Sequence, residues 1–369
     1  MIYFDHNATT AIDDRVLETM LPFLKFFFGN PSSLYRHGRL VRSAIDTARE
    51  QIAGVIGVHV TQIIFTSGGT EANNLALTAI KSDSKLAISA VEHPSITEPA
   101  EYLARQGHEL KFIGVDRNGI VSQEAINEII QQRPALVSIM LANNETGVIQ
   151  DVAHYAQQLK NKGIIVHTDA VQALGKIPID FKRLGVNMMT LSSHKIYGPK
   201  GCGALIVDKD VNLKAMLLGG GQEQGLRAGT ENVPAIIGFG KAAELAGLEL
   251  AQRAGHLLKL RNILEDRLLS IQGISIFAKD VERLPNTVQF GMEGMDGEML
   301  LMKLDKKGIA VSSGSACASG GGKPSSVLVA MGVTAELAKG AIRVSLGKSN
   351  TEEEIIEFID LLETLVTPG

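Results

Sequence analysis

The chain has 369 residues, of which 45% are apolar, and this length suggests about two domains. Its net charge of −4 leaves no basic excess for phosphates, which argues against a nucleic-acid or membrane-surface partner. No apolar run reaches the roughly 18 residues of a spanning helix. The start, MIYFDHNATT, lacks the basic and apolar stretches of a signal peptide, and there are only two cysteines, Cys202 and Cys317. We therefore expect a cytoplasmic protein in a reducing compartment.

Helical and strand-like stretches alternate up to about residue 256. Apolar residues at helical spacing predict helices over residues 41–57, 68–82 and 96–107. Buried strands are predicted over residues 62–67, 86–93, 136–145, 164–170, 187–195 and 203–208. Continuous apolar strands separated by helices indicate an α/β fold, with a mostly parallel sheet flanked by helices. We assign this pattern to a large domain over residues 14–256.

The pattern changes near Leu257. A long polar helix over residues 256–271 is followed by shorter strands and then by two helices. The short strands are expected over residues 275–279, 287–292 and 309–313. We interpret residues 257–369 as a smaller α+β domain, joined by residues 1–13.

The two cysteines stand in different surroundings. Cys202 precedes an apolar strand, so we interpret it as a small buried residue. Cys317 lies in SSGSACASGGG, whose other residues are all Ser, Ala or Gly. Such residues bury little and lock few rotamers, which predicts a mobile loop over about 312–324. That segment alone is also compatible with a disordered linker that carries an incidental cysteine.

Polar residues follow the predicted strands, at the edge where parallel sheets bind ligands. They are Gly69, Thr70, Glu92, His93, Asn143, Asn144, Asp169, Gln172, Ser192, His194 and Lys195. The Gly-rich turn before Thr70 could bind an anion at a helix start or serve only as a capped turn. Asp169 could cap a helix or pair with a buried cationic nitrogen. Together with His167 it makes only a weak metal site, because a third ligand is missing.

Lys195 is the most informative of these residues. A lysine in this position is usually a solvated charge, yet Ser192, Ser193 and His194 surround it with hydrogen-bonding groups. A desolvated lysine has a lowered pKa and can form a Schiff base with an aldehyde. Pyridoxal phosphate (PLP) requires such a lysine, a carboxylate for its ring nitrogen and a phosphate site. Lys195, Asp169 and the turn before Thr70 supply one of each.

A series of short motifs occurs along the chain in the same order as in a known protein family. They are YFDHNATT, GNPSS, FTSGGTEANN, EHPS, NNETG, HTDAVQ, SSHKIYGPKG, GGGQEQGLRAGTEN, SSGSACASG and IRVSLG. With them the chain resembles cysteine desulfurases of the NifS/IscS type, within the class V aminotransferases of PLP fold type I. The resemblance covers nearly the whole sequence and implies PLP as the cofactor.

The resemblance also implies roles for individual residues. Lys195 would bind PLP covalently, Asp169 would pair with the pyridine nitrogen, Gln172 would bind the phenolic oxygen and His93 would stack on the ring. The phosphate would be held by Gly69, Thr70, Ser192 and His194. Thr230 would reach the phosphate in the neighbouring subunit, which implies a homodimer. The substrate carboxylate would be held by Asn144 and Arg343, because a guanidinium fork suits a carboxylate. Taken singly, His93 could be a structural histidine and Arg343 a surface ion pair.

The same resemblance makes Cys317 the sulfur acceptor. Lys195 would take the Cα proton of L-cysteine, and the Cys317 thiolate would attack the substrate sulfur, leaving a persulfide and L-alanine. A free thiol has a pKa near ~8.5, so a base such as His93 would assist. The persulfide would pass to an acceptor protein for iron–sulfur cluster assembly or tRNA thiolation. Cys317 could also share an iron–sulfur cluster with a partner, and no resident metal is expected.

Two departures from the family pattern concern partners. GGGK at 320–323 replaces a more usual leucine-and-acid pair, and the sequence ends at VTPG without the tail with which relatives bind an iron–sulfur scaffold. Two alternatives stay open. One is a selenocysteine lyase or another class V enzyme, and the other is a non-catalytic scaffold that recruits sulfur-transfer proteins.

Overall fold

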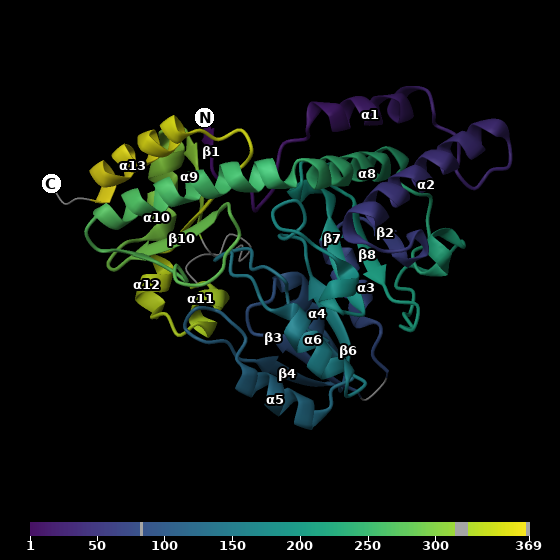
Figure 1. Cartoon of the computed structure of the whole chain (residues 1–369), viewed down its shortest axis with the longest axis horizontal. Coiled ribbons are helices and arrows are strands. Elements are labelled where there is room, and N and C mark those ends of the chain that lie inside the picture. Colours follow the sequence, from purple (N-terminus) through teal and green to yellow (C-terminus); the bar gives the residue numbers. More distant parts are fainter. Residues whose placement is uncertain (82–83, 314–323, 367–369) are drawn as a thin grey trace.

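A computed structural model describes residues 1–81, 84–313 and 324–366. Its centre is a seven-stranded sheet in the order β2-β8-β7-β6-β5-β3-β4 (Figure 1). The strands are β2 (Ile63–Thr66), β3 (Lys85–Ser89), β4 (Glu109–Ile113), β5 (Leu136–Ser138), β6 (Ile165–Asp169), β7 (Met188–Ser192) and β8 (Gly203–Val207). Only β8 runs antiparallel to its neighbours. The predicted α/β fold with a mostly parallel sheet is confirmed.

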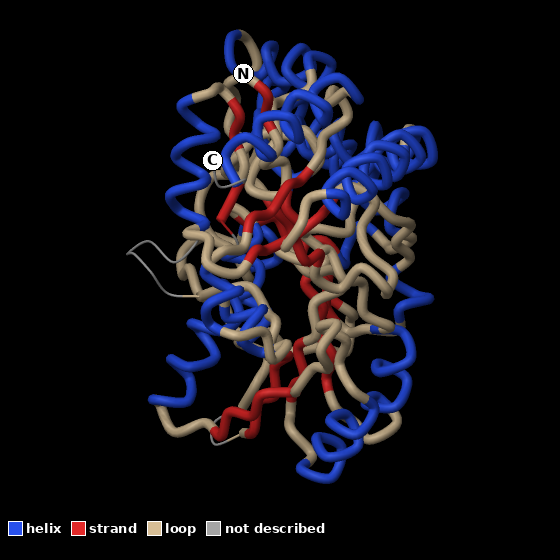
Figure 2. Tube along the Cα trace, turned by 90° about the vertical axis from the view of Figure 1, so that its left-hand side faces the viewer, coloured by secondary structure: helices blue, strands red, loops and turns tan. Residues whose placement is uncertain are grey.

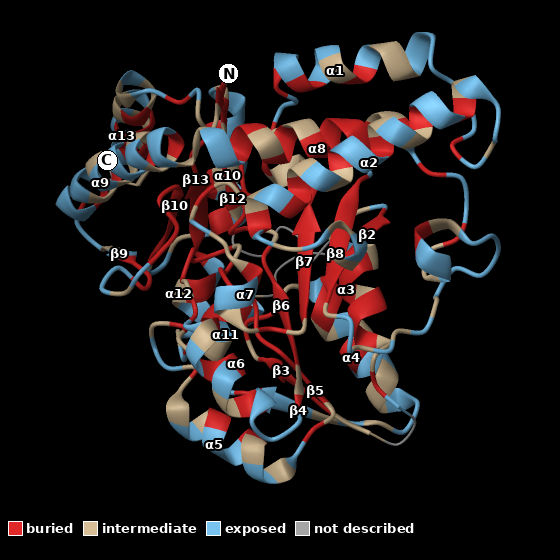
Figure 3. Cartoon of the chain, turned by 45° about the vertical axis from the view of Figure 1, so that its right-hand side comes forward, coloured by how far each residue is buried: buried red, intermediate tan, exposed pale blue. Residues whose placement is uncertain are grey.

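Both faces of this sheet are covered by helices, because successive strand residues point to opposite sides. Ile63 and Phe65 pack into one core and Ile64 into the other. The larger core lies under α2 (Arg36–Ile56), α5 (Gln123–Gln132), α6 (Val152–Lys160) and α8 (Val233–Leu248). The smaller core lies under α3 (Gly69–Leu77) and α4 (Pro94–Arg105). Figure 3 shows the strands buried between these layers.

The sequence of α2 explains which of its faces is buried and where the helix ends. In α2 the buried residues Val41, Ile45, Ile52 and Ile56 recur at helical spacing, and the helix ends at Gly57, whose φ of 73° suits glycine. The remaining helices of this part are α1 (Asp14–Lys25) and α7 (Phe181–Leu184).

A second core lies beside the large sheet. Its four-stranded antiparallel sheet has the order β12-β13-β10-β9, and β1 pairs with β11 in a separate parallel pair. The strands are β1 (Ile2–Tyr3), β9 (Ile274–Ile276), β10 (Thr287–Met292), β11 (Ile309–Ala310), β12 (Ser312–Ser313) and β13 (Ile342–Ser345). The helices are α9 (Leu250–Ser270), α10 (Gly297–Lys306), α11 (Ser326–Ala330), α12 (Ala335–Lys339) and α13 (Glu352–Val366). Phe4 packs edge-on against Phe358 in this core.

The expected domain boundary at 256/257 falls inside α9, which begins at Leu250. The helix begins earlier than its apolar residues indicate, because a charged residue, Arg253, occupies a buried position in its first turns. Arg253 pairs with Glu249 at 2.6 Å, and its guanidinium lies 5.1 Å from the ring centre of Tyr197. The division of the chain into two domains stays a prediction.

Another expectation was that residues 309–313 form one strand. They form two short strands instead, and Ser312–Ser313 pairs with β13, so these two residues belong to a sheet and not to the cysteine loop. Figure 2 shows the strands of both sheets in side view.

Within the described residues, no helix combines the length and apolar character needed to cross a membrane.

Candidate active site

A cavity of about 460 Å³ opens at the carboxyl ends of the large sheet, facing the second core. Most of the predicted site residues line it. They are Gly69, Thr70, His93, Asn144, Asp169, Gln172, Ser192, His194, Lys195 and Arg343. Thr230 is exposed and is not among the lining residues. Cys317 lies outside the described residues.

Lys195 is held by the N-terminal segment of the chain. It follows β7 in a short 3-10 turn, and its Nζ donates to the carbonyl oxygens of Asn7 and Ala8, each at 2.6 Å. Thr10 binds the same loop, since its N–H and its hydroxyl both donate to the carbonyl oxygen of His194 at 3.0 Å. The segment thus crosses from the second core to fix the amine at the cavity wall.

Asp169 ends β6 and is 4% exposed. Its Oδ1 accepts the N–H of Val171 at 2.9 Å, so part of its role is to cap the following turn. Its Oδ2 accepts from the buried side-chain amide of Asn73 at 2.7 Å. The carboxylate is therefore held at a fixed place in the cavity wall, ready to face a cationic nitrogen.

His93 lies at the start of α4. Its Nδ1 accepts the backbone N–H of Ser95 at 3.1 Å and lies 2.8 Å from the Ser95 hydroxyl. Burial lowers the pKa of His93, and the charges of Lys195 and Arg343 lower it further, while Asp169 opposes them. His93 is consequently a neutral imidazole at neutral pH.

Gln172 belongs to a buried network around the side chain of Asn7. Its Nε2 donates to the Asn7 carbonyl at 2.9 Å, and its Oε1 accepts from Lys176 Nζ at 2.6 Å. Lys176 also donates to Asn7 Oδ1 at 2.9 Å. Burial, with the charges of Lys195 and Arg343, lowers the pKa of Lys176 well below its usual value. Since the Gln172 amide has two N–H donors, one remains for a ligand.

The part of the cavity wall at the start of α3 suits an anion. The helix α3 begins at Gly69 and Thr70, where backbone N–H groups are unpaired within the helix. A Cβ at Gly69 would lie 3.1 Å from a methyl group of Val171, so only glycine fits easily. The buried Ser192 Oγ has no hydrogen-bond partner among the described residues. Burial and the charges of Lys195 and Lys200 lower the pKa of His194 to about 4.

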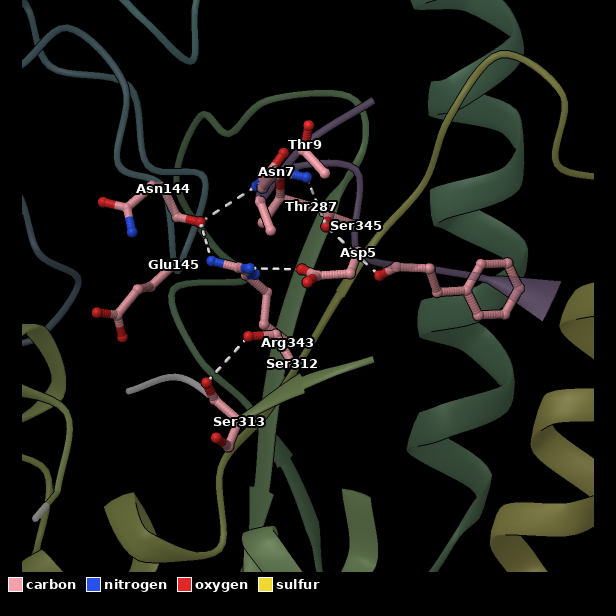
Figure 4. A network of polar contacts seen from close by, with 12 residues as sticks. Asp5, Asn7, Thr9, Asn144, Glu145, Thr287, Ser312, Ser313, Arg343 and Ser345 are labelled. Carbon is pink, nitrogen blue, oxygen red and sulfur yellow. Dashed lines mark hydrogen bonds and ion pairs between the residues drawn. The ribbon is translucent and has the colours of Figure 1, made fainter. Parts of the chain in front are cut away.

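Arg343 approaches the cavity from β13, in the second core. Figure 4 shows its guanidinium between Asp5 and Asn144: it forms an ion pair with Asp5 at 2.6 Å and donates to the Asn144 carbonyl at 3.0 Å. The side chain is 6% exposed, so it is no surface ion pair. A guanidinium held in this way can present its remaining N–H groups to a carboxylate.

The segment that carries Cys317 is anchored beside the cavity at both described ends. Ser312 pairs in register with Arg343, and Pro324 and Ser325 line the cavity. The Ser325 hydroxyl donates to the buried Glu145 carboxyl at 2.5 Å. Burial raises the pKa of Glu145, which also lines the cavity.

Two other residues singled out in the sequence have structural roles. Cys202 is a free, buried thiol, as predicted, and burial raises its pKa. His167 is buried, and its two ring nitrogens contact Ser138 Oγ at 2.9 Å and Thr190 Oγ1 at 3.0 Å. Both nitrogens are thus occupied within the core, and His167 is not available to a metal.

These residues fit PLP. The lysine amine, the buried carboxylate and the anion site at the start of α3 line one cavity. The Ser192 hydroxyl, which has no partner within the described part of the chain, and the backbone N–H groups at the start of α3 are features that a phosphate would complete.

Several residues of the site were not assigned roles from the sequence. Asn7, Asn73, Ser95, Glu145 and Lys176 all contact lining residues. Four of them fall within or next to the motifs quoted for the resemblance, which is the signal that could have marked them. Their contacts depend on chain crossings that no local pattern reveals.

Comparison with known proteins agrees with this geometry. The family model for the class-V aminotransferases, "Aminotransferase class-V", matches residues 2–358. The chain belongs to the class-V aminotransferase family. A relative within it, "Cysteine desulfurase IscS 1" of Archaeoglobus fulgidus, is 43% identical over 99% of this chain and 97% of its own length.

Solved structures of this family superpose over nearly the whole chain. One described as a "NIFS-LIKE PROTEIN" has a TM-score of 0.93 at 40% identity, with 99% of both chains covered. Another, "SspA in complex with cysteine", has a TM-score of 0.83 at 30% identity and covers 95% of this chain and 100% of its own. The class-V fold expected from the motifs is confirmed.

Proposed function

We propose that the protein is a PLP-dependent cysteine desulfurase, which removes sulfur from L-cysteine and releases L-alanine. The observation that carries the proposal is one cavity lined by Lys195, Asp169 and Arg343 and bordered by the ends of the segment that bears Cys317. Relatives at 43% and 42% identity over 99% of the chain are named cysteine desulfurases, and one similar structure was solved with cysteine.

The cofactor would be held by residues already described. Lys195 would bind its aldehyde carbon, Asp169 would face its ring nitrogen, and Gln172 and His93 would contact the ring. The phosphate would be held by Gly69, Thr70, Ser192 and His194. When bound, PLP supplies an electron sink for the electrons released at the substrate Cα.

The substrate would be oriented by its carboxylate. Arg343 is fixed by Asp5 and by the Asn144 carbonyl, so its planar fork is preorganised for a carboxylate. The Asn144 side chain also lines the cavity and would donate a further hydrogen bond. With the carboxylate bound there, Lys195 would take the Cα proton.

Cys317 would receive the sulfur. Its thiolate attacks the substrate sulfur, and the carbon–sulfur bond breaks. The electrons of that bond stay with the amino acid, which takes up a proton and leaves as L-alanine, while Cys317 retains a persulfide. Cys317 is four residues after Ser313, so the chain limits it to about 14 Å from the end of β12. That range includes the cavity beside Arg343.

The protein would act as a homodimer. Exposed apolar side chains precede α2, including Phe28 and Leu34, which are 82% and 87% exposed. Arg42 of α2 pairs with Glu231, next to the exposed Thr230, at 2.6 Å, and it also donates to the carbonyl oxygen of Pro31 in this apolar stretch at 3.4 Å. A second copy packed there would shield these side chains and bring Thr230 toward the partner's phosphate site.

The persulfide would be passed to an acceptor protein, for iron–sulfur cluster assembly, tRNA thiolation or both. The IscS names of the relatives support a role of this kind. The expected compartment is the cytoplasm, since a chain with two cysteines and no CxxC pair suits a reducing environment.

The two cysteines allow a matched experiment. Alanine release from L-cysteine is measured for the native enzyme, Cys317→Ala and Cys202→Ala. We expect loss of turnover in Cys317→Ala and native turnover in Cys202→Ala. Lys195→Ala should lose both turnover and the visible absorption band of bound PLP. Full turnover in Cys317→Ala would contradict the sulfur-acceptor role, and a native protein that binds no PLP would contradict the whole proposal.

A further inference from the structure

Four side chains form a continuous line of hydrogen bonds along one wall of the cavity. Asn73 Nδ2 lies 2.7 Å from Asp169 Oδ2 and 2.7 Å from Ser95 Oγ, and Ser95 Oγ lies 2.8 Å from His93 Nδ1. Asn73 comes from α3 and is fully buried, while Ser95 comes from α4 and is 8% exposed. The line therefore joins the predicted partner of the cofactor nitrogen to the predicted stacking histidine.

The direction of these hydrogen bonds follows from the chemistry of each group. A carboxylate oxygen accepts, so the NH2 side of the Asn73 amide faces Asp169. Its second hydrogen goes to Ser95 Oγ. The Asn73 carbonyl oxygen is left buried without a partner among the described residues. An unpaired oxygen in the interior is unfavourable, so solvation of the Asn73 amide does not explain its position. The two hydrogen bonds of its NH2 group do.

The hydrogen bond from Asn73 to Ser95 determines how Ser95 interacts with His93. Because Ser95 Oγ accepts from Asn73, its own hydrogen is available to His93 Nδ1. The Ser95 backbone N–H, 3.1 Å away, donates to the same nitrogen. With two donors directed at it, Nδ1 carries no proton, and the proton of the neutral ring is on Nε2.

We propose that Asn73 and Ser95 are positioning residues that tie His93 to Asp169 and hold its ring with Nδ1 as acceptor and Nε2–H available to the cavity. This inference rests on the proposed desulfurase function and deepens it. His93 then enters the reaction as a hydrogen-bond donor through Nε2–H, and it is not the base that ionises the Cys317 thiol.

The surroundings of His93 oppose a second proton on the ring. Burial disfavours the charged ring, and Lys195 and Arg343 add positive charge from two other elements, while Asp169 acts in the opposite direction. The carboxyl groups of Glu92 and Glu145 also line the cavity, and burial raises the pKa of both.

Nitrogen NMR of the holoenzyme with ¹⁵N-labelled histidine tests the assignment directly. His93→Gln identifies the His93 signals among the nine histidines of the chain. We expect an unprotonated Nδ1 and a protonated Nε2 in the native enzyme. Ser95→Ala removes the hydroxyl donor to Nδ1, and Asn73→Leu removes the donor that directs the Ser95 hydroxyl hydrogen to Nδ1. Each should raise the His93 pKa by about half to one unit. Ser122→Ala is the control: it removes a serine cap at α5 that does not line the cavity, and it should not change the His93 signals.

Steady-state kinetics distinguish a positioning role of Ser95 from a purely structural role. In Ser95→Ala we expect kcat for alanine release to fall about 10-fold with little change in KM. Ser95→Ala removes only one hydroxyl. The experiment therefore still tests the proposal if Asn73→Leu does not fold. A proton on Nδ1 in the native enzyme, or a native His93 pKa and kcat in Ser95→Ala, would overturn the proposal. A native enzyme with the expected His93 signals that releases no alanine supports the positioning assignment and refutes the desulfurase function.

Discussion

Replacement of Arg343 by lysine tests how the substrate is held. The guanidinium is fixed by Asp5 at 2.6 Å and by the Asn144 carbonyl at 3.0 Å. The proposed role of its remaining N–H groups is to bind the substrate carboxylate. A lysine in this position has one point charge, which the Asp5 carboxylate would attract away from the cavity. The variant should lose at least one charged hydrogen bond to the substrate.

The magnitude follows from that one bond. A hydrogen bond to a charged group contributes about 1.5–3 kcal/mol, and each 1.4 kcal/mol is a factor of ten in binding. Arg343→Lys should therefore raise KM for L-cysteine about 10- to 100-fold, with a smaller change in kcat. The control is Arg15→Lys, because Arg15 also pairs with an aspartate, Asp13 at 2.8 Å, and does not line the cavity.

The assay is steady-state alanine release with two substrates, L-cysteine and L-cysteine methyl ester, whose carboxylate is blocked. The native enzyme should prefer L-cysteine by about the same 10- to 100-fold factor, and Arg343→Lys should lose this preference. An unchanged KM in Arg343→Lys, or a preference for L-cysteine that survives the substitution, would refute the proposed carboxylate site.

Three further predictions concern stability and reactivity. Asn7→Ala removes the hydrogen bonds of its side chain to Lys176, Asn286 and Thr287, and urea denaturation should show a loss of about 3–5 kcal/mol, whereas a loss below 1 kcal/mol would contradict the network. Burial lowers the pKa of His167 to about 3, so below pH ~6.5 the unfolded chain binds a proton that the folded chain does not. Stability should thus fall by about 2 kcal/mol from this residue between pH 7 and pH 5, and urea denaturation of His167→Gln at the two pH values should lack that part of the loss. In Cys317→Ala, thiol reagents should label Cys202 only after unfolding, because it is buried with a raised pKa, and rapid labelling of the folded protein would contradict this.

The strand-end part of the site could be predicted from the sequence because parallel strands bring their carboxyl ends to one edge of a sheet. Asp169 is the last residue of β6 and Lys195 lies just after β7, its neighbour in the sheet, and the apolar residues of both strands are evident in the sequence. Arg343 was placed only through the family resemblance, since it arrives from a strand of the second core. The role of Asn7 was not predicted, because nothing local shows that the N-terminal segment crosses to the large sheet.

Elements with a weak apolar signal were also missed. The edge strand β4, Glu109–Ile113, buries only Ile113 fully, and Lys111 and Glu109 face solvent, so its pattern resembles a loop. The start of α9 was placed too late, because a paired arginine occupies the buried position where a leucine would be expected. The pairing of β4 with β3 holds the first of these elements, and the pair of Arg253 with Glu249 occupies the first turns of the second; hydrophobic periodicity reveals neither.

The central claim is that sulfur leaves L-cysteine and is held on one of the two cysteines. Mass spectrometry of the native holoenzyme after incubation with L-cysteine, without reductant, tests it most directly. We expect the mass of added sulfur on the peptide that contains Cys317, none on the peptide that contains Cys202, and no addition in Lys195→Ala. Sulfur on Cys202, or alanine formed with no sulfur on Cys317, would contradict the account.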